Sequence, residues 1–164
     1  MVRRFTQEEL QHWQNVAITP AEEPDLDAIL ALQKLAYQSE AQRYSDFNLP
    51  PLLQTPEEIR ADFGRMAFFK ATSGERIVGS VRGYVRNGTC HIGRLIVHPD
   101  AQNRGIGARL MQTLEQRFDA VQRFELFTGH QSDPALHLYH KLGYREFKRQ
   151  DMATHTIVFL EKER

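Results

Sequence analysis

The chain of 164 residues contains 41% hydrophobic and 26% charged residues, values typical of one soluble globular domain. Lys and Arg number 21 and Asp and Glu number 21, so the net charge is zero and gives no global field that would attract nucleic acid or an anionic membrane. The single cysteine, Cys90, excludes an internal disulfide and a thiolate metal cage, while a polar N-terminus and the lack of a membrane-length apolar run favour a cytoplasmic location.

The N-terminal stretch predicts a helical extension ahead of the domain. Thr6 and Glu9 have the spacing of a capping box, in which two side chains bond reciprocally to the backbone of a helix's first turn. We therefore expect a helix within residues 1–14, followed by a short strand over residues 16–19 that Pro20 stops.

Two helices separated by a loop are predicted next. Apolar residues recur at helical spacing from residue 24 to about residue 42, which predicts the first helix. Two prolines in YSDFNLPPLLQ, residues 44–54, predict an irregular loop. Thr55 and Glu58 then form a second capping box with proline in the first turn, which predicts a helix that ends near Gly64.

Three strand-like segments follow and predict an antiparallel hairpin series. They span residues 66–72, 76–86 and 89–97. Asn87 and Gly88 join the last two segments, and Asn-Gly between such runs is the strongest short-range hairpin signal.

The remaining elements alternate between helix and strand. Apolar residues recur every four positions after residue 105 and predict a buried helix face. The expected elements are helix 106–118, strand 123–128, helix 135–142 and strands 144–150 and 155–162. The whole pattern predicts an α+β domain with one mostly antiparallel sheet.

Two glycines in HPDAQNRGIGARLM, residues 98–111, lie where a strand gives way to a helix. The first turn of a helix has unpaired N–H groups and partial positive charge, so it can hold a phosphate. Gly105 and Gly107 would leave the approach open, and Arg104 and Arg109 would add positive charge. The stretch therefore predicts an anion-binding cradle.

A glycine pair at the start of a helix can also have other roles. An isolated GxG can simply form a tight turn between a strand and a helix. A dinucleotide-binding fingerprint needs a third glycine where this chain has Leu110, and a P-loop needs Lys and Ser or Thr where it has Ala108 and Arg109. Both nucleotide-binding motifs are therefore excluded.

The segment QNRGIG, residues 102–107, resembles the Q/R-x-x-G-x-G/A signature of the GNAT family of N-acetyltransferases. RLIVHPD before it resembles that family's central strand and turn, and LYHKLGYREF resembles its late helix–strand segment. The resemblance covers nearly the whole chain from about residue 16. It implies a single-domain GNAT fold over residues 1–164, with a mixed sheet of about seven strands flanked by about four helices.

The resemblance also implies acetyl-CoA as the acetyl donor and no metal. In the family, the donor lies where two central strands separate. The backbone of Leu95, Ile96 and Val97 would then run alongside the pantetheine and acyl group. The pyrophosphate would be held by the amides of Asn103, Arg104, Gly105, Ile106, Gly107 and Ala108. Ser132, which replaces a family asparagine, would contact the cofactor or cap the following helix.

Tyr139 matches the family tyrosine that lies near the CoA sulfur, which implies a general acid for the departing thiolate. Without the resemblance, Tyr139 would be assigned to the apolar face of its helix, so simple packing stays an alternative.

The general base is less clearly marked. His91 falls where one branch of the family has its glutamate, and strand alternation would put His91, Gly93, Leu95 and Val97 on one face. A histidine without a catalytic role is the alternative. Another branch places its glutamate at the position of Phe127, with Glu125 a weak substitute.

Tyr44, Asp46 and Phe47 lie in the loop that borders the acceptor site in this family. They offer an aromatic wall and a carboxylate suited to an ammonium-bearing acceptor, although an ordinary connecting loop would look the same. The expected function is acetyl-CoA-dependent transfer to a primary amine by direct attack in a ternary complex. The alternative is an acyl-CoA-binding sensor without turnover. An exposed strand edge would allow a homodimer.

Overall fold

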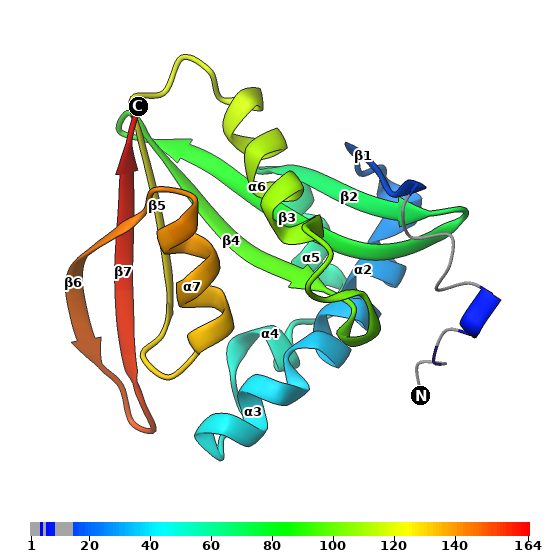
Figure 1. Cartoon of the computed structure of the whole chain (residues 1–164), viewed down its shortest axis with the longest axis horizontal. Helices are drawn as coiled ribbons and strands as arrows, with labels where there is room; N and C mark the ends of the chain where they lie inside the picture. The colour runs from blue at the N-terminus through cyan, green and yellow to red at the C-terminus, as the bar shows by residue number, and fades with distance from the viewer. Residues whose placement is uncertain (1–3, 5, 9–14) are drawn as a thin grey trace.

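The computed structural model describes residues 4, 6–8 and 15–164. The protein has a seven-stranded mixed sheet with helices on both faces (Figure 1). The strand order is β1-β2-β3-β4-β5-β7-β6, and every neighbouring pair is antiparallel except β4 and β5. The strands are β1 (Ala17–Pro20), β2 (Ala67–Ser73), β3 (Arg76–Arg86), β4 (Thr89–Val97), β5 (Arg123–Gly129), β6 (Arg145–Asp151) and β7 (Thr156–Glu163). The predicted single-domain α+β architecture is confirmed.

The helices divide between the two faces of the sheet. They are α2 (Leu26–Ala36), α3 (Gln38–Tyr44), α4 (Pro50–Leu53), α5 (Pro56–Phe63), α6 (Ile106–Arg117) and α7 (Asp133–Lys141), with 3₁₀ turns η2 (Glu23–Asp25) and η3 (Pro99–Ala101). In Figure 1, α6 and α7 lie in front of the sheet, while α2 and α5 lie behind it. None of the helices in the described part of the chain is long and apolar enough to span a bilayer.

The described residues thus form more helices than the four or so expected. The segment predicted as one helix over residues 24–42 is divided at Tyr37, whose ψ of 0° ends α2 before α3 begins. The expected irregular loop contains α4, because its prolines occupy the first two helical positions, where no backbone N–H is needed. Most of the predicted N-terminal helix, residues 1–14, lies outside the described residues.

Each face of the sheet has its own apolar core. On the α6–α7 face, Leu110 and Leu114 pack with Phe124 and other fully buried side chains. On the opposite face, Ile29 of α2 and Ile59 of α5 pack with the buried side chains of Phe68 and Ile96 from the sheet. Burial of one such side chain stabilises the fold by about 1.5–3 kcal/mol, so both helical layers are firmly attached to the sheet.

Candidate functional site

The parallel strands β4 and β5 pair only at one end. Their register joins three residue pairs, and the last of them is His91 with Glu125. Beyond this pair, β4 continues to Val97 and β5 to Gly129 without pairing with each other, and the two ribbons diverge toward α3 (Figure 1). We call this region the strand split. Backbone groups that face it have no ladder partner, which makes them available to a ligand.

The backbone of β4 directs specific groups into the split. The N–H of His98 donates to the carbonyl of Val78 on β3 at 2.8 Å. Because successive residues of a strand present their N–H and C=O to opposite edges, those of Leu95 and Val97 point away from β3. The N–H of Val97 is therefore directed toward the split.

A β-bulge interrupts β4 just before these residues. Arg94 has a φ of +50°, and the register with β3 shifts between Ser80 and Arg82. A bulge inserts one extra residue on one strand and so reverses which face its later side chains occupy. The faces of β4 must therefore be assigned separately on each side of Arg94.

The predicted common face of His91, Gly93, Leu95 and Val97 is wrong for this reason. Cys90, which is fully buried, lies before the bulge and belongs to the core beneath α6. Leu95 and Val97, beyond the bulge, pack against that same core. His91 therefore lies on the opposite face of the sheet, the face covered in part by α2.

His91 is accompanied by a carboxylate at the apex of the split. Its Nδ1 lies 3.6 Å from Oε2 of Glu125, and its ring stacks on Tyr84 with the centroids 5.1 Å apart. Arg123 also holds Glu125, with 2.8 Å between Nη1 and Oε1. An imidazole held between an aromatic ring and a carboxylate has the arrangement of an oriented base. From the sequence Glu125 is only a weak substitute for the base, whereas the structure places it beside His91.

Tyr139 approaches from the other face, on α7. Only 8% of it is exposed, and burial raises the pKa of its phenol well above the usual value. Tyr37 and Glu40, at the junction of α2 and α3, raise this pKa further. Its hydroxyl makes no hydrogen bond to any residue that the structure describes. Tyr139 therefore keeps its proton and can donate it.

The loop before α6 has the conformation of an anion cradle. Gly105 precedes the helix with a φ of +78°, and no heavy atom lies within 4 Å of a Cβ built at this position. The first turn of α6 has no acidic residue and no side-chain cap. Its N–H groups, from Ile106 to Ala108, therefore lack partners within the helix and can receive an anion.

Gly107 has a different role from the one predicted. A Cβ there would lie 3.2 Å from Cδ2 of Leu138 and 3.8 Å from the side chains of Leu95 and Val97. Its missing side chain lets α6 pack closely on α7 and β4. Only Gly105 is left open, so the expectation that both glycines clear an approach is correct for one of them.

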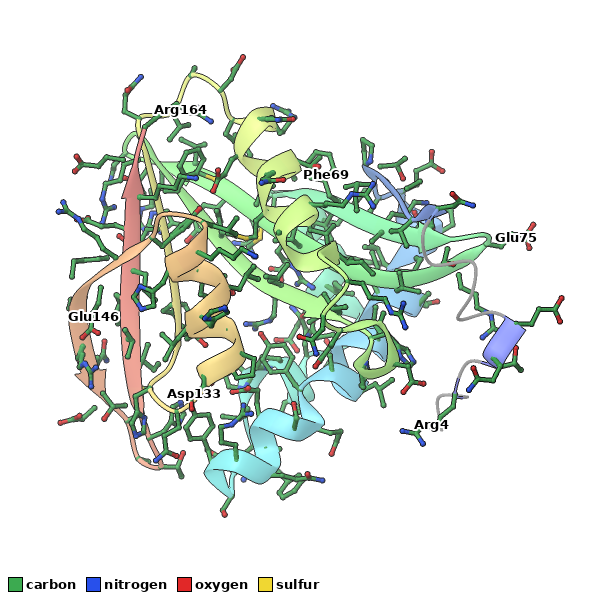
Figure 2. All side chains as sticks on the ribbon, in the orientation of Figure 1. Arg4, Phe69, Glu75, Asp133, Glu146 and Arg164 are labelled. Atoms are coloured by element: carbon green, nitrogen blue, oxygen red, sulfur yellow. The ribbon has the colours of Figure 1, made fainter. Side chains whose placement is uncertain are left out.

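Ser132 belongs to a hydrogen-bonded chain between α3 and α7. The N–H of Gln131 donates to Tyr44 Oη at 2.9 Å, Tyr44 Oη lies 2.8 Å from Ser132 Oγ, and Ser132 Oγ donates to Glu40 at 2.6 Å. The Ser132 side chain does not cap α7, one of the two roles expected for it. In Figure 2 the start of α7, marked by Asp133, faces α3.

The three acceptor-site candidates do not share one open surface. Tyr44 is buried against Gly129, where an added Cβ would clash with its hydroxyl. Asp46 accepts bonds from the N–H of Asn48 at 2.9 Å and from Thr154 at 2.8 Å. Phe47 is 56% exposed. These residues fix the end of α3 against the loop between β6 and β7.

Cys90 and the histidines offer no competing centre in the described part of the chain. Burial raises the pKa of the Cys90 thiol to about 12, so it stays protonated and unreactive. No three His, Cys, Asp or Glu side chains of the described residues gather as metal ligands would.

Comparison with known proteins identifies relatives over most of the chain. Residues 26–144 match the acetyltransferase (GNAT) family. A curated protein of Bacillus subtilis (strain 168), "UPF0157 protein YqkA", is 28% identical over 118 residues, which are 72% of this chain. The match covers only 34% of that protein, so this chain spans about a third of the length of its curated relative.

Solved structures share the fold at low sequence identity. The ribosomal-protein-S18-alanine N-acetyltransferase of Escherichia coli superposes with a TM-score of 0.76 and 18% identity, covering 90% of this chain and 93% of that one. The PaiA N-acetyltransferase of Thermoplasma acidophilum, solved in complex with coenzyme A, gives 0.69 and 15% identity, covering 92% and 99%. The smu.2055 protein of Streptococcus mutans UA159 gives 0.78 and 16%, covering 90% and 98%.

Proposed function

Because this chain belongs to the acetyltransferase (GNAT) family, we propose that it transfers an acetyl group from acetyl-CoA to a primary amine of a small molecule, peptide or protein by direct attack in a ternary complex. The observation that carries the proposal is the strand split between β4 and β5, with His91 and Glu125 at its apex and Tyr139 in the core on the face opposite His91. The open start of α6 provides the matching anion site.

The residues present suit the donor. Acetyl-CoA carries a pyrophosphate and a thioester, and the start of α6, with Gly105 open, suits the pyrophosphate. The backbone of Leu95, Ile96 and Val97, which borders the split, suits the pantetheine and the acyl group. A protein with the same fold was solved with coenzyme A, which supports this assignment. Asn103 to Ala108 are the proposed amides of the cradle, while Ser132 is already bonded to Glu40.

Three groups of this chain would then act on the reaction. His91, whose Nδ1 lies 3.6 Å from Glu125, takes the proton of the attacking amine through bridging water, and Glu125 is a positioning residue. The N–H groups of Leu95 and Val97, which both point into the split, are the candidates to stabilise the negative charge that develops on the thioester oxygen. Tyr139 returns a proton to the departing thiolate. Acid and base reach the split from opposite faces, so neither obstructs the other.

The base assignment predicts a defined loss in a His91→Gln variant. We expect kcat/KM to fall about 100-fold at neutral pH, because glutamine keeps the polar contact with Glu125 but cannot take up a proton. Steady-state thiol release measures this, and His137→Gln, an exposed histidine on α7, is the control. An unchanged kcat/KM in His91→Gln would remove His91 from the mechanism and leave the role to water.

Thiol release from acetyl-CoA over a panel of amines tests the proposed function itself. The panel contains amino acids, polyamines, aminosugars and lysine-bearing peptides, and we expect rapid release with one of these classes. Calorimetry with acetyl-CoA runs in parallel. Binding without release from any amine would instead favour the acyl-CoA sensor, and no binding at millimolar acetyl-CoA would contradict both functions.

A further inference from the structure

Arg94 has an unusual environment at the bulge of β4. Its Nε is fully buried and has no hydrogen-bond partner among the described residues. The guanidinium forms no ion pair with any carboxylate of those residues. The side chain as a whole is half-buried, but this part of the charged group is withdrawn from water without a hydrogen bond in return, which costs stability.

The neighbouring cation makes the environment of Arg94 more positive. Arg82 of β3 is 97% buried, since its exposed fraction is 3%, and the charge of Arg94 helps to lower its pKa to about 10, after the larger effect of burial. Two guanidinium groups therefore share one partly buried region. The excess of positive charge in this region favours the binding of an anion.

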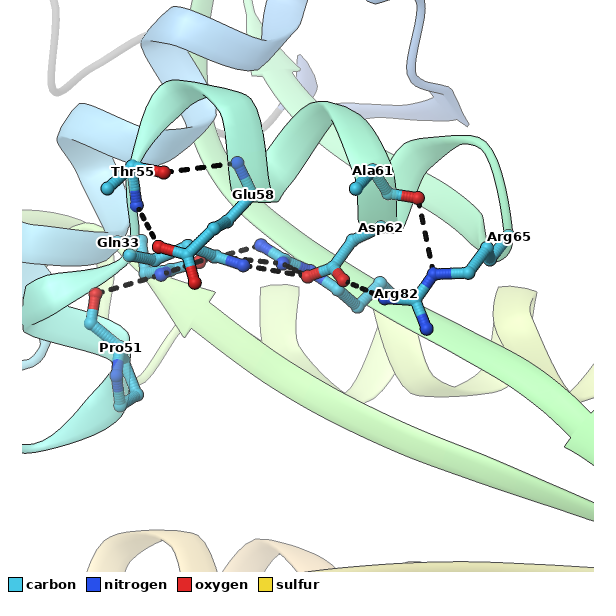
Figure 3. Close-up of polar contacts among 9 residues, drawn as sticks. Gln33, Pro51, Thr55, Glu58, Ala61, Asp62, Arg65 and Arg82 are labelled. Atoms are coloured by element: carbon cyan, nitrogen blue, oxygen red, sulfur yellow. Dashed lines mark hydrogen bonds and ion pairs between the residues drawn. The ribbon is translucent and has the colours of Figure 1, made fainter.

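The available carboxylate is already used by Arg82. Nη1 of Arg82 lies 3.1 Å from Asp62 and 3.2 Å from Gln54, while Nη2 donates to Gln33 at 2.6 Å (Figure 3). Asp62 also pairs with Arg65 at 2.6 Å. This network from α2, α4, α5 and β3 balances Arg82 but leaves Arg94 without a counter-charge.

The backbone of Arg94 is also strained. A φ of +50° is rarely adopted by arginine and costs roughly 1 kcal/mol or more. Gly93 stands directly beside it and would adopt the conformation freely, yet the chain places the bulge at Arg94. Bulges beside active sites redirect side chains. The charge of Arg94 acts on the pKa values of both Arg82 and Tyr37, so its guanidinium lies in their neighbourhood.

This location is the side of the split from which the amine would arrive. Arg82 contacts α2, and His91 lies on that same face at the last position of β4 that pairs with β5, three residues before Arg94. An anion bound at Arg94 would therefore lie close to the amine that His91 deprotonates. The helix α6, whose start forms the cradle, lies on the other face of the sheet (Figure 1).

We propose that Arg94 binds a carboxylate of the acceptor, so that the substrate is an amino acid or another small molecule with both an amine and a carboxylate. This inference rests on the proposed acetyl transfer. Tyr44 and Asp46, which were expected to border the acceptor, have their polar groups bonded within the protein, so Arg94 is the better candidate for a polar contact with it.

Matched pairs of amines test this proposal. L-Amino acids and ω-amino acids are each compared with their carboxamides, which keep the amine and remove the charge. We expect kcat/KM for the best acid to exceed that of its amide at least 10-fold. In Arg94→Gln this preference should disappear through a rise in KM of about 10- to 100-fold, and Arg94→Lys should restore part of it.

The controls separate acceptor binding from folding and from donor binding. Arg86→Gln, at the exposed end of β3, should keep the preference. Arg94→Asn provides a second variant, because asparagine tolerates the left-handed conformation and preserves the bulge. The Kd of acetyl-CoA, measured by calorimetry, should stay within about 2-fold in all four variants.

Three results would overturn the proposal. If the wild type uses acids and amides with equal kcat/KM, the acceptor's carboxylate is not recognised. If Arg94→Gln loses acetyl-CoA affinity as much as it loses acceptor affinity, the arginine binds the donor instead. Acetylation of polyamines or aminosugars with silence for every amino acid would overturn the inference while the proposed function stands. Silence for all amines would overturn both.

Discussion

Replacing Gly105 with glutamate is expected to weaken acetyl-CoA binding by at least about 100-fold, which corresponds to roughly 3 kcal/mol. The new carboxylate would occupy the open space before α6 and meet the same first-turn N–H groups that we assign to the pyrophosphate. It would also repel the phosphates. Calorimetry and the shift in melting temperature on addition of acetyl-CoA both measure the loss.

Gly88→Glu is a closely matched control for this prediction. Gly88 has a φ of +76°, against +78° for Gly105, and no heavy atom lies within 4 Å of a Cβ at either position. Both substitutions therefore cause the same backbone strain, but Gly88 lies in the turn between β3 and β4. Equal acetyl-CoA affinity in Gly105→Glu and Gly88→Glu would show that the start of α6 is not the anion site.

Local patterns predicted much of the fold. β3 and β4 begin and end as expected, because the Asn87–Gly88 turn fixes both their pairing and their ends. The capping box of Thr55 and Glu58 likewise forms as predicted, with Glu58 N–H donating to Thr55 at 3.1 Å. In these cases neighbouring residues alone determine the structure, so the sequence carries the full signal.

Features that depend on distant residues were not predicted. The helical spacing of apolar residues continues through Tyr37, so it does not indicate that α2 ends there. The division of α2 from α3 goes with the packing of α3 against the start of α7, which is distant in sequence. The bulge falls on Arg94 although Gly93 is the better residue for it, so no local preference indicates the position. Both features decide which groups border the split.

The bulge would also let one short strand serve the two substrates of the proposed reaction. Before Arg94, β4 presents His91 to the face of α2, and after it presents Leu95 and Val97 to the face of α6. A regular strand would have placed all three side chains on one face. The acceptor and the donor can therefore be held from opposite sides of the same unpaired backbone, and their reacting atoms meet at the split.

Tyr139→Phe is expected to lower kcat by about 100-fold or more while acetyl-CoA affinity changes less than about 2-fold. The ring keeps its place in the core, and no hydrogen bond to the described residues is lost, so the melting temperature should change little. Because the pKa of Tyr139 is raised, its proton stays in place where an ordinary tyrosine titrates, and kcat in the wild type should not fall as the pH rises from neutral to about 10.

The neighbouring Tyr144 distinguishes chemistry from packing. Its buried hydroxyl donates to Glu115 at 2.6 Å, and its ring centroid lies 6.1 Å from that of Tyr139. Tyr144→Phe removes a buried hydrogen bond and should lower the melting temperature, but it should leave kcat within a few fold of the wild type because this hydroxyl serves only the core. If Tyr139→Phe resembles Tyr144→Phe in both measurements, Tyr139 packs the core and donates no proton, whereas loss of kcat in Tyr139→Phe alone assigns the acid to α7.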